Sequence, residues 1–276
     1  MQLRERQFNW GAQTYLMGVL NVTPDSFSDG GKFDTVDAAL GQAKFMEEAG
    51  VDLVDIGGQS TRPGAMEIAV EEELNRVVPV VRALRKVSSI PISVDTSRSI
   101  VARAAVAAGA DVVNDISGGT GDPQMLATVA QLRVPVVLMH LRGTPETMQT
   151  LTDYEDLVGE ICQVLERRAN AAISAGVDPK AIVLDPGIGF AKTHEQNLTI
   201  LRELPKVRSL GYPVLVGVSR KSFIGRILDR PNPNDRVWGT GAACAAAIVG
   251  GADILRVHDV REMGDICRVA DAIFRR

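Results

Sequence analysis

The stretch Val214-Leu-Val-Gly-Val-Ser-Arg-Lys-Ser-Phe-Ile-Gly225 contains the structural unit that decides the fold of this chain. It begins with an apolar, β-branched run, which is typical of a strand buried on both faces. It ends as the start of a helical segment at residues 222–228. Between the two, residues 219–222 place two cations and two hydroxyls ahead of free helix N–H groups, which suits the binding of an anion. A solvated turn without a ligand is an equally good interpretation of this stretch alone.

The same unit of strand, polar cluster and helix recurs along the whole chain. After a polar N-terminal entry, strands are predicted at residues 14–22, 53–57, 90–95, 111–115, 134–140, 181–185, 213–218 and 253–258. Helical periodicity follows them at residues 36–49, 71–87, 99–108, 124–132, 157–175, 195–204, 222–228 with 237–249, and 260–274. Eight such units without a linker indicate one α/β domain over residues 1–276, a (β/α)8 TIM barrel. A doubly wound open sheet is the alternative.

The composition excludes several classes of protein. The chain has 276 residues and a formal net charge of -4, without a basic stripe of the kind that binds nucleic acid. No apolar run is long enough to span a bilayer, and the start, Met1-Gln-Leu-Arg-Glu-Arg-Gln7, lacks the apolar core of a signal peptide. The cysteines Cys162, Cys244 and Cys267 have no CxxC spacing. We therefore expect a cytoplasmic protein with neither a membrane nor a nucleic acid as partner.

Several common catalytic motifs are missing from the sequence. Gly187-Ile-Gly189 is followed by Lys192 where a dinucleotide-binding motif needs its third glycine, and there is no GxxxxGK[ST] phosphate loop. The chain has only three histidines and no HExxH, which argues against metal-centred hydrolysis. It also lacks a GxSxG elbow for a serine nucleophile. Binding of a small molecule together with an anion is the chemistry that remains.

Polar residues follow the predicted strands at their carboxyl ends, where a (β/α)8 barrel carries its active site. These residues are Asn21, Gly57, Gly58, Asp95, Asn114, Asp115, His140, Asp185, the cluster 219–222, Arg256 and His258. Each of them alone is better explained by local hydrogen bonding. Together they place polar groups from every strand on one rim, which indicates a small-molecule site.

The residue types narrow the chemistry of this rim but leave alternatives open. Asp95 and Asp185 suit a general acid–base or glycosidase pair, and equally two acceptors for a ligand with an amidine-like edge. The cations near Asn21 suit a phosphorylated or pyrophosphorylated substrate. They are Arg62, Arg220, Lys221 and Arg256, with His258 beside them.

Two long segments resemble signatures of the dihydropteroate synthase family. They are Gly18-Val-Leu-Asn-Val-Thr-Pro-Asp-Ser-Phe-Ser-Asp-Gly-Gly31 and Asp55-Ile-Gly-Gly-Gln-Ser-Thr-Arg-Pro-Gly64. Shorter matches follow in order: Asp95-Thr-Ser97, Asn114-Asp115, Met139-His140, Thr147-Met-Gln149, Asp185-Pro-Gly-Ile-Gly-Phe190, Ser219-Arg-Lys-Ser222 and Arg256-Val-His-Asp259. Because the matches extend from about Thr14 to the C-terminus, the chain is identified as a member of this pterin-binding family.

The resemblance implies a transferase of folate biosynthesis, of the kind that sulfonamides inhibit. This family joins 6-hydroxymethyl-7,8-dihydropterin pyrophosphate to p-aminobenzoate and releases 7,8-dihydropteroate and pyrophosphate. Its cofactor is Mg2+, held on the pyrophosphate, and the carbon–oxygen bond breaks early because an aromatic amine is a weak nucleophile. The family is also dimeric. The Ala- and Gly-rich residues 240–251 suit a contact with a second copy, and equally packing within the barrel.

The resemblance further implies roles for individual residues. Pterin binding is expected of Asp95, Asn114, Asp185, Lys221 and Arg256, and p-aminobenzoate binding of Phe27, Thr61, Pro63, Phe190 and Ser222. Pyrophosphate binding is expected of Asn21, Arg62, Ser219, Arg220 and His258. Asn21 is the expected Mg2+ ligand, and the expected catalytic groups are Asn21, Arg62, Lys221 and His258. The loops 23–31 and 58–64 are expected to close over the substrates and exclude water.

Gln59 departs from the family pattern, in which a glutamate is expected at this position. The change removes a charge beside Thr61 and Arg62, so an inactive pterin-binding paralogue is one alternative function. A methyltetrahydrofolate-binding methyltransferase barrel, with a corrinoid protein as partner, is another. The retained pyrophosphate residues argue against the paralogue. The cluster 219–222 and the segment Thr61-Arg-Pro63 argue against the methyltransferase.

Overall fold

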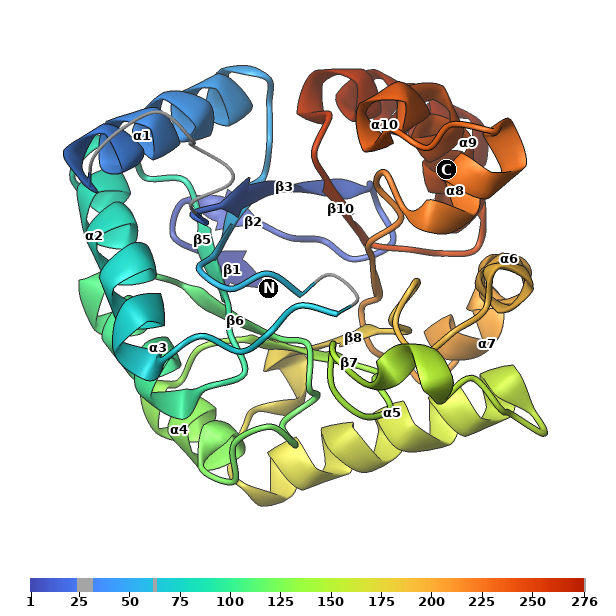
Figure 1. Ribbon diagram of the computed structural model, residues 1–276, viewed down its shortest axis with the longest axis horizontal. Helices are drawn as coiled ribbons and strands as arrows, with labels where there is room; N and C mark the ends of the chain where they lie inside the picture. Colours follow the sequence, from blue (N-terminus) through green and yellow to red (C-terminus); the bar gives the residue numbers. More distant parts are fainter. Residues whose placement is uncertain (24–31, 62–63, 276) are drawn as a thin grey trace.

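A computed structural model describes residues 1–23, 32–61 and 64–275 of the chain (Figure 1). Its barrel consists of the parallel strands β3 (Tyr15–Asn21), β4 (Leu53–Gly57), β5 (Ile92–Asp95), β6 (Val112–Asp115), β7 (Val136–Met139), β8 (Ile182–Asp185), β9 (Leu215–Val216) and β10 (Ile254–Val257). They pair in the order β8-β7-β6-β5-β4-β3-β10-β9, and a bridge between Leu184 and Val214 joins β8 to β9. The predicted single-domain (β/α)8 TIM barrel is therefore confirmed.

The helices form the outer layer of the barrel, as Figure 1 shows. They are α1 (Lys32–Glu48), α2 (Val70–Val87), α3 (Ser99–Ala108), α4 (Met125–Leu132), α5 (Leu157–Ser174), α6 (His194–Arg202), α7 (Leu204–Arg208), α8 (Ser222–Leu228), α9 (Val237–Val249) and α10 (Val260–Phe274). Short 3-10 turns occur at η2 (Met148–Thr150), η3 (Pro179–Ala181) and η4 (Pro233–Arg236).

Three boundaries differ clearly from the sequence prediction. Helix α1 begins at Lys32, earlier than the predicted 36. The predicted helix 195–204 ends at Arg202 and is followed by the separate helix α7, because Pro205 lacks the N–H that would continue the first helix. Strand β9 has two residues where six were predicted, and Gly217 follows it, as is typical where a strand weakens.

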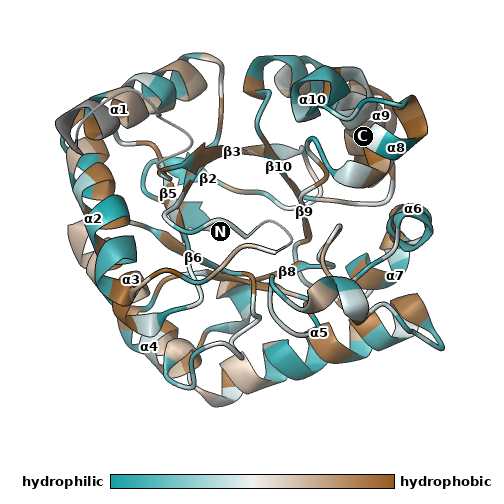
Figure 2. Ribbon diagram, in the orientation of Figure 1, coloured by the Kyte–Doolittle hydropathy of each residue, from teal (hydrophilic) through white to brown (hydrophobic). Residues whose placement is uncertain are grey.

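Alternation of side chains along the strands produces both the core and the site. Outward-facing residues such as Val54, Ile56 and Val94 pack against the helices. Inward-facing residues fill the N-terminal half of the barrel; they are Tyr15, Met17, Leu53, Val112, Val137, Val183, Leu215 and Ile254. In Figure 2, β3 and β10 are accordingly drawn mainly as hydrophobic ribbon. Residues two apart along a strand share a face, so several inward positions closer to the carboxyl ends are polar; they are Asn21, Asp55, Asp95, Asn114, Asp185 and Arg256.

A β-hairpin closes the N-terminal end of the barrel, where the sequence indicated only a polar entry. Its strands, β1 (Gln2–Leu3) and β2 (Arg6–Gln7), pair antiparallel. Leu3 and Phe8 pack on the inward-facing core, and the Phe8 ring centroid lies 4.6 Å from that of Tyr15. Periodicity did not predict this hairpin because two-residue strands are too short to display alternation.

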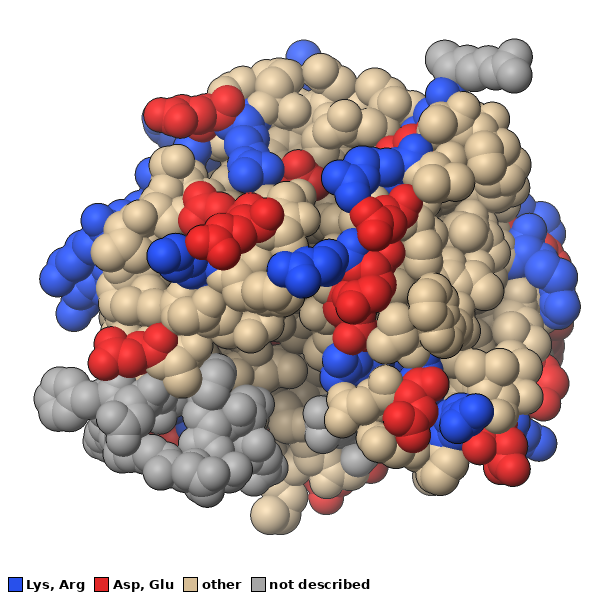
Figure 3. All heavy atoms as spheres, turned by 90° about the horizontal axis from the view of Figure 1, so that it is seen from above, with Lys and Arg blue, Asp and Glu red and all other residues tan. Residues whose placement is uncertain are grey.

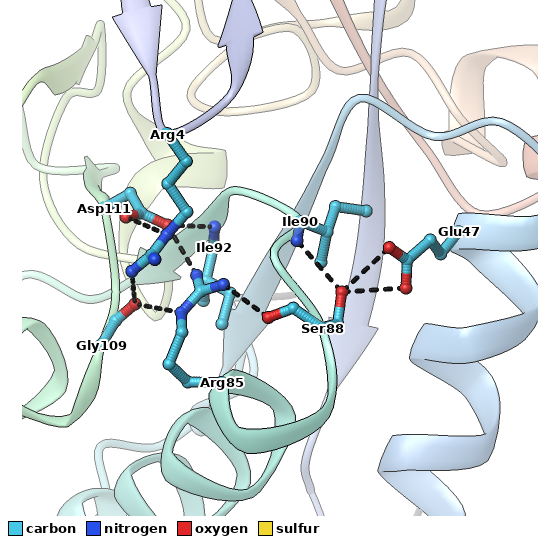
Figure 4. Close-up of polar contacts among 8 residues, drawn as sticks. All are labelled: Arg4, Glu47, Arg85, Ser88, Ile90, Ile92, Gly109 and Asp111. Carbon is cyan, nitrogen blue, oxygen red and sulfur yellow. Dashed lines mark hydrogen bonds and ion pairs between the residues drawn. The ribbon is translucent and has the colours of Figure 1, made fainter.

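A polar network fastens the hairpin to the barrel (Figure 4). The guanidinium groups of Arg4 and Arg85 each lie 2.7 Å from one oxygen of the Asp111 carboxylate. Asp111 also accepts a hydrogen bond from the N–H of Ile92 at 2.9 Å, and both arginines donate to the carbonyl of Gly109. The network lies before β5 and β6, at the end of the barrel that serves stability in this fold.

The surface charges are mixed in sign. On the face seen in Figure 3, Lys and Arg side chains lie among Asp and Glu side chains, and neither sign forms a continuous patch. That face therefore has no basic stripe of the kind that binds nucleic acid. Among the helices of the described residues, none combines the length and the apolar character needed to cross a membrane.

Candidate active site

The carboxyl ends of four neighbouring strands bring polar residues into one layer. The register pairs Asn21 with Gly57 and Gly57 with Asp95. Asp95 is in turn paired with Asn114 on the next strand. A Cβ atom built on Gly57 would lie 3.4 Å from the Cβ of Asp95 and 3.7 Å from Oδ1 of Asn21. The glycine therefore keeps space open between the amide and the carboxylate.

A buried carboxylate, Asp55, connects this layer to the last strand of the barrel. Its Oδ2 accepts hydrogen bonds from Nε of Arg256 at 2.7 Å and from Nδ2 of Asn114 at 3.0 Å. The same guanidinium donates through Nη2 to Oδ2 of Asp95 at 2.8 Å. Burial lowers the pKa of Arg256, but Asp55 and Asp95 outweigh this effect and raise it. Arg256 is thus a fixed cation held between two acids.

The side chain of Asp95 is a weaker acid than an ordinary aspartate. Burial is the main cause that raises the pKa of Asp95 to about 7, against the lowering effect of Arg256. The neighbouring carboxylates of Asp55, Glu73 and Asp115 add to the rise. Near neutral pH, Asp95 is therefore able to accept or to donate a hydrogen bond.

Asp185 lies at the end of β8, paired in register with Met139. Its Oδ1 accepts the N–H of Gly187 at 2.7 Å, and burial is the main cause that raises the pKa of Asp185 to about 6. Gly187 has a φ of 72°, and a Cβ atom there would lie 2.1 Å from the carbonyl oxygen of His140. Only glycine fits this turn, and its N–H fixes one carboxylate oxygen of Asp185.

Lys221 belongs to the strand-to-helix turn after β9. Its Nζ lies 4.3 Å above the ring centroid of Phe190, which comes from the loop after β8. Burial, followed by the charge of Arg256, lowers the pKa of Lys221 to about 8. Asp185 and Asp95 oppose this shift, so the amine lies within the electrostatic influence of both acids. The fold thus brings Phe190, predicted to bind p-aminobenzoate, into contact with Lys221, predicted to bind the pterin.

Ser219 and His258 form a hydrogen-bonded pair between neighbouring strand ends. The Ser219 Oγ accepts the backbone N–H of His258 at 3.1 Å and lies 3.0 Å from its Nδ1. Burial, followed by the charge of Arg256, lowers the pKa of His258 to about 3, so the ring is neutral. The two contacts fix the orientation of the ring, because the Ser219 hydroxyl lies against both the backbone N–H and Nδ1 of His258.

Arg220 lies apart from this cluster. Its guanidinium forms a bidentate ion pair with Asp259 and donates to Oδ1 of Asn234 at 2.6 Å. Its backbone has a left-handed φ of 59°, held by Thr240, whose hydroxyl accepts the N–H at 3.0 Å, and by Arg236, which donates to the carbonyl. The charge of Arg220 is therefore already paired with the Asp259 carboxylate.

For the remaining predicted site residues, the structure shows either their exposure alone or no description at all. Asn21 and Thr61 are half-buried and Ser222 is exposed at the start of α8. Phe27, Arg62 and Pro63, with most of the loop 23–31, lie outside the described residues. The amide oxygen of Asn21 suits Mg2+, a cation commonly bound by one or two protein oxygens together with substrate phosphates.

Two residues at the site carried no role in the sequence analysis. Asp55 is the inward residue between Leu53 and Gly57, so the alternation of β4 contained the signal that could have identified it. Lys192 is buried, and its Nζ lies 2.7 Å from the Phe190 carbonyl and 3.0 Å from Nδ1 of His140. Burial lowers the pKa of Lys192 to about 7. In the sequence, Lys192 was noticed only because it stands where a dinucleotide-binding motif needs its third glycine.

Comparison with known proteins reveals close similarity over nearly the full chain. The family described as "Pterin binding enzyme" matches residues 17–258. A dihydropteroate synthase of Synechocystis is 59% identical over 268 residues, covering 97% of this chain and 93% of that protein. The structure of a Clostridium difficile dihydropteroate synthase with pteroic acid has a TM-score of 0.93 and 43% identity, covering 98% of this chain and 100% of the other. A Xanthomonas albilineans dihydropteroate synthase with 4-aminobenzoic acid has a TM-score of 0.90 and 46% identity, covering 95% and 94%.

Proposed function

The chain belongs to the pterin-binding enzyme family, among its dihydropteroate synthases, and from this membership we propose the role of each site residue in the reaction. The reaction joins 6-hydroxymethyl-7,8-dihydropterin pyrophosphate to p-aminobenzoate and gives 7,8-dihydropteroate and pyrophosphate. We place it in the cytoplasm, where the free cysteines Cys162, Cys244 and Cys267 stay reduced. The observation that carries the proposal is the buried group of Asp95, Asn114 and Asp185 beside the cations Lys221 and Arg256.

The pterin binds against these acceptors. Its amino-pyrimidine edge offers parallel N–H groups, which a carboxylate accepts with two hydrogen bonds. Asp185 supplies this carboxylate, because one of its oxygens is already fixed by the Gly187 N–H. Asn114 is held through its amide nitrogen by Asp55, so its amide oxygen is left to face the ligand. Lys221 donates to the pterin carbonyl and ring nitrogen, and Arg256 covers the ring face.

The pyrophosphate end uses a different set of groups. The ring of His258, held at Nδ1 by Ser219, has Nε2 available for the pyrophosphate. Asn21 and Arg62 complete the site, with Arg220 available after it leaves Asp259. Asn21 would hold Mg2+, which supplies a positive charge to neutralise the departing pyrophosphate. Donors placed where negative charge develops stabilise the transition state without reorganisation.

The chemical step needs no basic nucleophile from the protein. The carbon–oxygen bond breaks early and leaves its electron pair on the oxygen of the departing pyrophosphate, and the amine nitrogen of p-aminobenzoate bonds to the methylene carbon of the pterin. The amine then releases a proton. Phe190 lies beside Lys221, so an aromatic amine stacked on its ring would lie next to the pterin. Thr61, Pro63, Phe27 and Ser222 are the further residues that we assign to p-aminobenzoate.

One assay tests the reaction. Purified protein is mixed with Mg2+, the pterin pyrophosphate and p-aminobenzoate, and pyrophosphate release is followed. We expect release that requires p-aminobenzoate, with dihydropteroate formed in equal amount. Tight pterin binding without release would contradict the proposal and identify an inactive paralogue.

The proposed function includes a homodimer, formed through α8 and α9. Exposed apolar side chains gather there: Ile227 is 61% exposed, Trp238 80% and Val249 58%. An apolar groove of about 560 Å3 lies beside them, lined by residues of α6, α8 and α9. Because exposed apolar surface of this extent is unfavourable in water, a second copy of the chain is the proposed partner.

Sedimentation of the purified protein tests the dimer. We expect the wild type to sediment as a dimer and Val249→Asp as a folded monomer, because a buried charge without a partner opposes association. Ile100→Asp is the control, since Ile100 is 55% exposed on the distant helix α3. A monomeric wild type, or a Val249→Asp protein that remains dimeric, would refute this interface.

A further inference from the structure

A buried acid of helix α2, Glu73, has been described above only as one of the carboxylates that raise the pKa of Asp95. It is 2% exposed and belongs to the first turn of the helix. Its Oε1 accepts the hydroxyl of Thr96 at 2.6 Å, and its Oε2 accepts Nη1 of Arg98 at 2.9 Å. A carboxylate is expensive to bury without such partners, so this residue is fixed in one orientation.

Arg98 extends this contact to the loop that precedes the helix. Its Nη2 donates to the carbonyl of Ile68 at 2.7 Å and lies 3.7 Å from the exposed carboxylate of Glu67. Ile68 closes the loop between β4 and α2, the same loop that carries Thr61, a proposed contact of p-aminobenzoate. The carboxyl end of the loop is therefore held by the Glu73–Arg98 pair.

The other end of the loop is held by the same part of α2. Arg76 donates through Nη1 to the carbonyl of Gly58 at 2.8 Å. A Cβ atom on Gly58 would lie 2.7 Å from Val77 and 3.3 Å from Cγ of Glu73, so only glycine packs this closely. Both ends of the loop thus depend on contacts made around Glu73.

Glu73 also contacts the pterin side of the site. Thr96, which donates to it, directly follows Asp95, and the N–H of Thr96 donates to the carbonyl of Asn114 at 3.0 Å. The hydroxyl of Thr96 in turn accepts the N–H of Arg98 at 3.2 Å. One carboxylate therefore joins the strand end that carries the pterin acceptors to the loop of the second substrate.

We propose that Glu73 and Arg98 are a positioning pair that sets the p-aminobenzoate loop against the pterin-binding strand ends. The pair touches neither substrate and acts through the carbonyl of Ile68 and the hydroxyl of Thr96. It determines the affinity for p-aminobenzoate, while the pterin acceptors keep their own supports in Asp55 and Gly187. This inference rests on the proposed function.

The test separates the two substrates in the Arg98→Met variant. With pterin pyrophosphate saturating, we expect the KM for p-aminobenzoate to rise about tenfold, the scale of one lost hydrogen bond to a charged group. The Kd of the pterin, measured by calorimetry, should stay within about twofold of the wild type. Arg98→Lys keeps the cation but lacks the two separate nitrogens that bond Glu73 and Ile68, so its KM for p-aminobenzoate should lie between those of the wild type and Arg98→Met.

Arg103→Met is the matched control, because within the described part of the chain Arg103 on α3 bonds Thr128 and Gln131, away from the loop. An unchanged KM for p-aminobenzoate in Arg98→Met would overturn the proposal. A proportional loss of affinity for both substrates would also overturn it, since that is the mark of a general structural role. If Arg98→Met does not fold, Arg98→Lys carries the same test. Wild-type turnover is measured first. An inactive wild type would refute the proposed function itself, whereas an active wild type leaves the variants to test the positioning role of Arg98.

Discussion

At the scale of the residue, burial gives the site its chemistry. Asp95, Asp185, Lys221 and His258 all have pKa values displaced mainly by burial. The displacement makes the acids weaker and the bases less basic, because burial disfavours the charged form of each group. Perturbed titratable groups gathered in one place are typical of a functional site.

Asp185→Asn tests this electrostatic picture. In the wild type we expect pterin affinity to fall as the pH drops through about 6, because protonation of Asp185 removes an acceptor. The variant should bind the pterin about 10- to 100-fold more weakly at neutral pH, the effect of losing a hydrogen bond to a charged group. Its affinity should also lose the step near pH 6. Calorimetry over pH 5–8 measures both effects, and unchanged pterin affinity in Asp185→Asn would exclude Asp185 as the pterin carboxylate.

The same raised pKa affects folding with a definite sign. The native carboxyl group binds its proton more tightly than the unfolded one, whose pKa is 3.8. Stability contributed by protonated Asp185 is therefore present at low pH and is lost as the pH rises from about 4 to about 6. Asp185→Asn removes this loss, since an amide does not titrate.

At the scale of the element, short turns between strand and helix fix the reactive groups. The turn after β8 has left-handed residues at Gly187 and Gly189, and Lys192 closes it by donating to the Phe190 carbonyl. The turn after β9 carries Arg220 at a left-handed φ. These turns hold the ligand groups on rigid strands, which keeps their geometry more constant than a longer loop would.

Gly187→Ala tests the first of these turns. A methyl group there would lie 2.1 Å from the carbonyl oxygen of His140 and would also occupy a left-handed backbone conformation. We expect the free energy of unfolding to fall by ~2 kcal/mol or more, and pterin affinity to fall with it because Asp185 loses its N–H partner.

Gly211→Ala is the control for this change. Gly211 has a φ of 85° but no atom within 4 Å of its built Cβ, so only the backbone strain applies. Urea denaturation should find a loss of ~1 kcal/mol in this variant, with pterin binding preserved. Equal losses in the two variants would mean that the close contact at Gly187 is unimportant.

At the scale of the whole molecule, the two ends of the barrel have separate tasks. The carboxyl ends of the strands carry the polar cluster, whereas the N-terminal end is filled with apolar residues and covered by the hairpin. Asp111 joins Arg4 of the hairpin to Arg85 of α2 (Figure 4). We therefore expect stability and catalysis to respond to different substitutions.

Asp111→Ala tests this separation. Removing the carboxylate leaves two partly buried guanidinium groups and the N–H of Ile92 without their acceptor, so the free energy of unfolding should fall by ~2–4 kcal/mol. The kcat of the folded enzyme should not change. Asp265→Ala, which breaks an exposed pair with Arg268, should change stability by less than ~0.5 kcal/mol. Thermal melts and steady-state kinetics on the same samples measure stability and kcat. A large loss of kcat in Asp111→Ala would contradict the separation of stability and catalysis between the two ends of the barrel.

The sequence alone determined the barrel and the composition of its rim. Eight repeats of a buried strand and an amphipathic helix predict a parallel sheet covered on both faces, and their number favours closure into a barrel over a doubly wound open sheet. Strand ends then fall on one rim, so Asp95, Asn114 and Asp185 were predicted together. The hairpin was not predicted, since four strand residues carry too little periodicity.

Only the tertiary structure decided which polar groups share partners. Asp55 is separated from Arg256 by 201 positions, and Lys192 from His140 by 52. Arg220, predicted to face an anion, lies paired with Asp259. Hydrogen bonds and ion pairs depend on distances of a few ångströms between residues remote in sequence, and closure of the barrel sets those distances. Local pattern specifies which side chains reach the mouth, whereas their pairing is a property of the folded chain.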